Sequence, residues 1–129
     1  MRMLSSHGDA ATVQLEASEI RFLRAACRYA LEYLGRWPTR SAESELQTTW
    51  QVHLSDVEDL LDRLEDLEFD EYVELSRTDT RVAVGMTADL LYRYLGTVTE
   101  REFEREIGLG RSVARTLEPQ LRALRESLG

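Results

Sequence analysis

The sequence has no lysine and no asparagine, only one cysteine and two prolines, and no long run of apolar residues. A single cysteine excludes an intramolecular disulfide and a cluster of thiolate metal ligands. A membrane-spanning helix needs roughly 20 consecutive apolar residues, and no run in this chain approaches that length. The first residues, MRMLSSHGDAA, also lack the apolar stretch of a signal peptide. We therefore expect a cytoplasmic protein that does not bind a membrane.

The residues that are present have the composition of one globular domain. The chain has 129 residues, of which 43% are hydrophobic and 31% charged. The hydrophobic content is enough for one core, and the length is too short for two ordinary domains. All 16 lysine-or-arginine positions are arginine, and 24 acidic residues bring the formal net charge to -8. The acidity is local, because residues 41–74 hold 12 acidic residues and one arginine. This segment must therefore carry most of the protein's negative surface.

Apolar residues in the first half of the chain recur at helical spacing. Residues 1–14 show no lasting period, and we expect them to form a flexible tail. A helix is predicted from Ser18 to the stop at Gly35. A short second helix is predicted from the capping-box spacing of Ser44-Glu-Leu-Gln47, with Thr39 or Ser41 as equally possible starts and Leu46 and Trp50 as its apolar contacts. The strongest pattern follows residue 55, where Ser-Asp-Val-Glu has the spacing of a capping box. It predicts a third helix that ends near Leu67.

The period changes from helical to alternating after this third helix. Apolar and polar residues alternate over 73–76 and again over 82–86, with Arg-Thr-Asp-Thr between them at 77–80, and this pattern predicts a β-hairpin. Further helices are predicted after Thr87, after Thr99 and towards the C-terminus, where apolar residues from Val113 onward recur every three or four positions. The expected fold class is mainly α with a small β-hairpin (α+β).

Three helices, a hairpin and another helix form the order of a winged helix-turn-helix domain. Leu46–Met86, with SDVEDLLDRLEDLE before the predicted hairpin, resembles the second helix, recognition helix and wing of MarR-type regulators. It is also similar to the winged-helix subunits that attach to kleisins in bacterial condensin complexes. The resemblance implies a winged-helix domain over 15–96 and a C-terminal helical extension of two extra helices over 97–129, in one compact unit. The resemblance indicates the fold and leaves the function open.

The predicted third helix has the wrong charge for reading DNA. In DNA-binding relatives the outward face of this helix enters the major groove, where phosphates repel carboxylates. The helical period turns four acidic residues outward: Glu58, Asp59, Asp62 and Asp66. We therefore expect this face to bind a protein partner, a basic one, and not nucleic acid. The alternative is a solvated acidic surface, kept for solubility or as a halophilic adaptation.

Arginines elsewhere allow a second hypothesis. Winged-helix regulators often place arginine on the wing, and basic residues here flank the predicted turn and begin the final helices. If the protein is a DNA-binding regulator, its contacts are Arg77, Arg81, Arg111 and Arg115. The arginines at the turn can equally serve to protect a strand edge from pairing with other chains.

The last helix carries leucines that suggest a homodimer. They recur every three or four residues, which is the spacing of a helix-helix seam. The candidate dimer seam consists of Leu117, Leu121, Leu124 and Leu128. The same spacing would also serve to cover the monomer's own core.

No set of residues with catalytic or metal-binding spacing is found. His7 and His53 stand alone, and Cys27 lies on the apolar stripe of the first helix, where a buried structural thiol is expected. We predict no catalytic residue, no metal site and no cofactor, and hence no enzyme. The sequence favours a non-catalytic interaction or regulatory module, with a winged-helix transcriptional regulator as the alternative.

Overall fold

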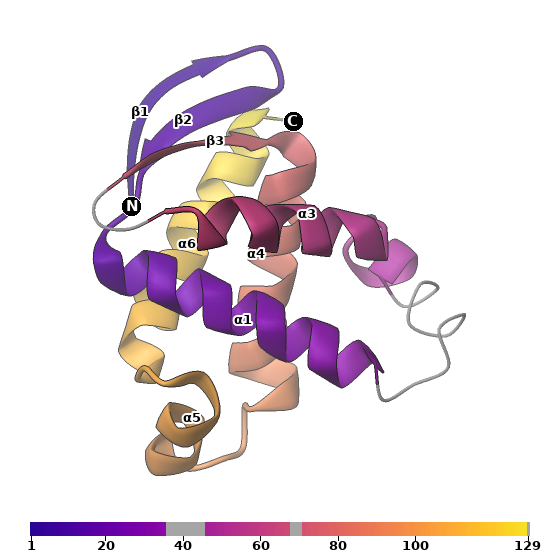
Figure 1. Ribbon diagram of the computed structural model, residues 1–129, viewed down its shortest axis with the longest axis vertical. Helices are drawn as coiled ribbons and strands as arrows, with labels where there is room; N and C mark the ends of the chain where they lie inside the picture. The colour runs from indigo at the N-terminus through magenta and orange to yellow at the C-terminus, as the bar shows by residue number, and fades with distance from the viewer. Residues whose placement is uncertain (36–45, 68–70, 129) are drawn as a thin grey trace.

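A computed structural model describes residues 1–35, 46–67 and 71–128 of the protein (Figure 1). The protein is mainly helical with a small three-stranded antiparallel sheet, which confirms the α+β class. Its elements are β1 (Arg2–His7), β2 (Ala10–Gln14), α1 (Ala17–Gly35), α3 (Leu54–Glu65), β3 (Tyr72–Ser76), α4 (Arg77–Asp89), the π-helical turn η1 (Leu90–Tyr94), α5 (Glu100–Ile107) and α6 (Arg111–Leu128). Residues 46–49 add one more helical turn, and the predicted starts of that helix, Thr39, Ser41 and Ser44, lie outside the described residues.

The helices surround α4, which lies in the middle of the molecule. Helices α1 and α3 pack against each other and lie across α4 and α6, which run side by side behind them in Figure 1. The sheet covers one end of this arrangement, and α5 lies at the opposite end. Because α4 has neighbours on several sides, adjacent residues such as Val82, Ala83 and Val84 are all buried.

The prediction of a flexible tail over residues 1–14 is wrong. These residues form the β1–β2 hairpin, in which His7 pairs with Ala10 across a two-residue turn. The turn contains Gly8 at φ +63°, a left-handed conformation that glycine adopts without strain. The sequence pattern of a strand is weak here because β1 is exposed along its whole length, so its apolar and polar residues do not alternate. Only β2 has a buried side, formed by Ala11 and Val13, which are fully buried.

The predicted hairpin over 73–86 is correct only in its first strand. Val73 lies in β3, but it pairs with Val13 of β2 and not with residues 82–86. Those residues belong to α4, whose start is closed by a capping box. Ser76 Oγ accepts a hydrogen bond from the backbone N–H of Asp79 at 3.0 Å, and the Asp79 carboxylate accepts one from the N–H of Ser76 at 2.8 Å. The segment 77–80 therefore starts a helix, and the predicted wing does not form there.

The remaining helices agree with the periodicity, with shifted ends. Helix α3 begins at Leu54, earlier than predicted, because the Asp56 carboxylate accepts a hydrogen bond from the N–H of His53 at 2.8 Å. Helix α5 has the predicted Thr99 as N-cap and ends at Ile107, with Gly108 as C-cap at φ 88°. Pro119 lies inside α6 without ending it.

Candidate protein-binding face of helix α3

Helix α3 has one buried and one acidic side. Val57, Leu60 and Leu64 are buried in the core, where they hold the helix against the rest of the protein. The opposite side consists of exposed carboxylates, which we call the acidic face: Glu58, Asp59, Asp62 and Asp66. The structure thus brings the four predicted partner-binding residues together on one surface.

The carboxylates of the acidic face have no ion-pair partner among the described residues. Within residues 1–35, 46–67 and 71–128, no ion pair or hydrogen bond links any of these four side chains to a guanidinium group. The one arginine on α3, Arg63, points elsewhere, since its guanidinium pairs with Asp79 and donates to the carbonyl oxygen of Glu74 at 3.1 Å. Within the described part of the chain, these exposed carboxylates are therefore available to a charged group from outside the protein.

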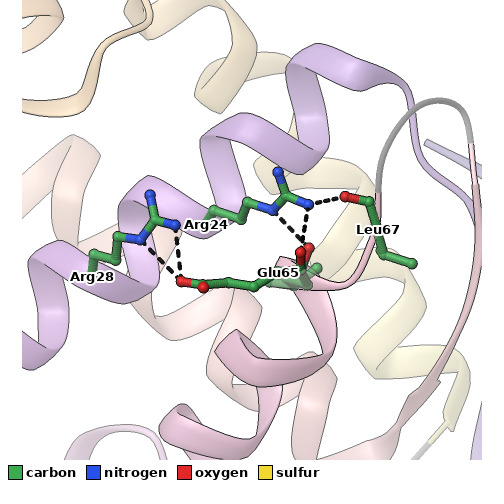
Figure 2. A network of polar contacts seen from close by, with 5 residues as sticks. Arg24, Arg28, Glu65 and Leu67 are labelled. Carbon is green, nitrogen blue, oxygen red and sulfur yellow. Dashed lines mark hydrogen bonds and ion pairs between the residues drawn. The ribbon is translucent and has the colours of Figure 1, made fainter.

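The C-terminal end of α3 is clamped to α1 by arginine (Figure 2). Arg24 Nε donates to the carbonyl oxygen of Leu64 at 2.6 Å, and its Nη2 donates to those of Glu65 at 3.2 Å and Leu67. The last carbonyl groups of a helix have no partner within the helix and carry partial negative charge. Arg24 satisfies them and offsets the unfavourable position of Asp66 near this end.

A second arginine of α1 separates Glu65 from the acidic face. Arg28 Nη2 lies 2.8 Å from Glu65 Oε1, and Nε of the same guanidinium donates to the same oxygen at 3.1 Å. Glu65 is therefore an internal ion-pair partner, although the sequence places it on the same helix as the other acids. The contacts of Arg24 and Arg28 with α3 were not predicted. Their one-turn spacing, which places both on one side of α1, is the only sequence feature that points to them.

The arginines of the DNA-binding hypothesis do not form one surface. Arg77 Nε donates to the carbonyl oxygen of Leu128 at the end of α6, whereas Arg111 at the start of α6 donates to the carbonyl oxygen of Leu95. Helices α4 and α6 are thus antiparallel, with Arg77 and Arg111 at opposite ends of the pair. Arg111 is also buried. It supports the fold instead of reaching a ligand.

The candidate dimer seam lies inside the single chain. Its four leucines are between 0% and 4% exposed. The seam prediction is wrong for these residues because α6 packs its apolar stripe against α4 and α1. These leucines cover the protein's own core, which is the alternative role that their spacing also allowed.

The part of the chain described by the structure holds no group of three or more His, Cys, Asp or Glu side chains that could bind a metal ion. Cys27 is buried, with its Sγ 3.4 Å from the sulfur of Met86. Burial raises the pKa of the Cys27 thiol from 9.0 to about 12, against the opposing effect of the nearby Arg28 charge. The thiol is therefore protonated at neutral pH and is a poor nucleophile.

This pKa leads to a testable expectation. The folded protein at pH 8 should resist alkylation by iodoacetamide, whereas the urea-unfolded chain should react, and mass spectrometry would count the modified thiols. Between about pH 9 and pH 12 the unfolded thiol loses its proton while the folded one keeps it, so the free energy of unfolding should fall as the pH rises through this window. Rapid, complete alkylation of the folded protein would contradict the burial of Cys27.

None of the helices in the described ranges is long and apolar enough to cross a membrane. Comparisons with family models, curated proteins and solved structures give no match to this chain. Membership of the winged-helix superfamily therefore stays a prediction.

Proposed function

We propose that this protein is a non-catalytic interaction module that binds a basic protein partner through the acidic face of α3. The observation that carries the proposal is the absence, among the described residues, of any counter-charge for four exposed carboxylates on one helix face. Like charges at helical spacing, such as Asp62 and Asp66, destabilise a helix by roughly 0.2–0.5 kcal/mol per pair. A partner that supplies arginine or lysine would remove this repulsion.

The rigid attachment of α3 to the rest of the protein also supports partner binding. Arg24 binds the carbonyl groups at the end of α3, and the buried side of the helix anchors its other turns, so the carboxylates are held on a rigid element. Exposed charges of this kind mainly accelerate association and select the partner by sign. We therefore expect binding that is fast at low ionic strength and weakens with salt.

DNA binding has less support. Affinity for DNA comes largely from cations that neutralise phosphates, and the proposed contacts Arg77 and Arg111 are separated by the length of the α4–α6 pair. Protein binding through α3 requires only one feature of a winged-helix domain, a third helix whose outward side contacts the ligand. A winged-helix regulator would need a basic docking surface on or near that helix.

The experiment compares two charge reversals of equal size. The double variant Asp59→Arg/Asp62→Arg changes the acidic face, and Glu104→Arg/Glu106→Arg makes the same change on the exposed side of α5. Each is immobilised and used to capture proteins from the native lysate at low and high salt. We expect a basic protein to be retained by the wild type and by the α5 variant at low salt and to be lost from the α3 variant.

Two results would count against the proposal. Equal capture by the α3 and α5 variants would show that the acidic face is not the binding surface. Saturable, salt-sensitive binding of random duplex DNA by the wild type would favour the regulator instead. Urea unfolding of both variants controls for loss of structure. The α3 variant should be about as stable as the wild type, because Asp62→Arg gains attraction to Asp66 while Asp59→Arg adds repulsion with Arg63 at the same helical spacing.

A further inference from the structure

A cleft of about 400 Å³ lies on a different part of the molecule, beside the turn that follows residues 46–49. This volume is within the range of small-molecule sites. Two helices and the turn contribute its lining: Arg81 and Gly85 from α4, Arg125 and Glu126 from α6, and Trp50 and Gln51 from the turn.

The wall of the cleft is held in a fixed position. A Cβ atom at Gly85 would lie 2.5 Å from Trp50 Cγ, so only glycine at this position lets the indole ring lie against α4. Trp50 Nε1 also donates a hydrogen bond to Asp89 Oδ2 at 2.8 Å. The next residue, Gln51, has φ 59°, a left-handed conformation that is uncommon outside glycine. Packing and a hydrogen bond thus determine the shape of the cleft before any ligand enters.

The two guanidinium groups in the cleft lack the partners that other enclosed arginines have. Arg81 and Arg125 are half-buried, yet neither has an ion pair or hydrogen bond within the described ranges. The buried or half-buried arginines elsewhere in those ranges all donate to backbone carbonyl oxygens: Arg24, Arg77 and Arg111. Glu126 also lines the cleft, but it is exposed and forms no ion pair with either arginine.

We propose that this cleft binds the phosphate group of a small molecule between Arg81 and Arg125. Guanidinium groups present planar, paired donors that match phosphate oxygens, and two of them on separate helices can approach one group from two sides. A bound dianion would supply the ion-pair partner that Arg81 and Arg125 do not find among the described residues. The site is separate from the acidic face of α3 and opposite to it in charge.

Inorganic phosphate and pyrophosphate are the probes, titrated at constant ionic strength maintained with chloride. The readout is the indole N–H resonance of Trp50, assigned with a Trp37→Phe variant because the chain has two tryptophans. We expect a saturable shift of this resonance, with pyrophosphate binding more tightly. Arg81→Gln and Arg125→Gln should each weaken binding about tenfold, since each removes one charge-assisted contact. Glu126→Gln should strengthen it.

Arg115→Gln is the matched control, because Arg115 is exposed on α6 outside the cleft and its replacement changes the net charge equally. A shift that grows linearly without saturation, or equal weakening by the control, would overturn the proposal. So would displacement of pyrophosphate by short duplex DNA at lower concentration, which would assign the cleft to a polymer. Arg125→Lys keeps the charge and the fold if a glutamine variant is unstable, and it should bind more weakly than the wild type.

Discussion

Replacing Arg111 by alanine should lower the free energy of unfolding by about 3 kcal/mol. The residue is only 9% exposed, and its Nη2 donates to the carbonyl oxygens of Leu95 at 2.6 Å and of Val98. Its guanidinium also lies 5.0 Å from the centre of the Phe103 ring. Alanine would leave two carbonyl groups without donors and a cavity beside an aromatic ring. Urea unfolding followed by circular dichroism would measure the loss.

Arg115→Ala is the control for this experiment. Arg115 lies one turn further along α6, is exposed, and forms no ion pair or hydrogen bond within the described ranges, so its removal should change stability by less than about 0.5 kcal/mol. If the two variants unfold at the same urea concentration, Arg111 does not hold the segment after η1 in place. An intermediate loss for Arg111→Met would separate packing of the aliphatic stem from the hydrogen bonds.

The contrast between Arg111 and Arg115 also shows where sequence reasoning stops. Both were predicted as DNA contacts because both are basic and begin the last helix. The acceptors of Arg111 lie in the segment that follows η1, and nothing near residue 111 in the sequence marks their approach. Burial of an arginine depends on such distant partners, so local composition cannot distinguish the two.

The helices that could be predicted are the ones with a single buried side. Helices α3 and α6 lie on the surface, and their apolar residues therefore recur at the helical period. Helix α4 is enclosed, so its buried residues include neighbours such as Val82 and Val84 and imitate the alternation of a strand. The pairing of Val73 with Val13 was hidden for another reason, because it joins segments far apart in the chain.

Some features of the candidate site could be predicted from the sequence, and others could not. The outward direction of Asp59 and Asp62 follows from the period of α3 and was predicted correctly. The ion pair of Glu65 with Arg28 depends on how α1 and α3 pack, which the pattern of neither helix contains. The half-buried arginines Arg81 and Arg125 likewise line one cleft only because α4 and α6 are adjacent.

Replacing Arg24 by alanine should destabilise the protein by about 2 kcal/mol, whereas Arg28→Ala should cost at most about 1 kcal/mol. The two arginines lie one turn apart on α1 and contact the same end of α3 (Figure 2). Arg24 is half-buried and donates to three carbonyl groups. Alanine would remove this donor from all three, although the Leu64 carbonyl oxygen would keep the backbone N–H of Leu67. The side chains of Arg28 and Glu65 are 58% and 46% exposed, so water can replace the ion pair between them.

Hydrogen exchange would locate the effect. Loss of Arg24 should speed exchange of the backbone amide of Leu67, which donates to the carbonyl oxygen of Leu64 at 3.2 Å, more than exchange in α6. The same fraying would move Asp66 away from its place on the acidic face, so binding of a basic partner should weaken although no carboxylate has been changed. Equal stability of the two variants would mean that the carbonyl contacts of Arg24 contribute no more than an exposed ion pair. The orientation of α3 would then depend mainly on its buried residues, Val57, Leu60 and Leu64.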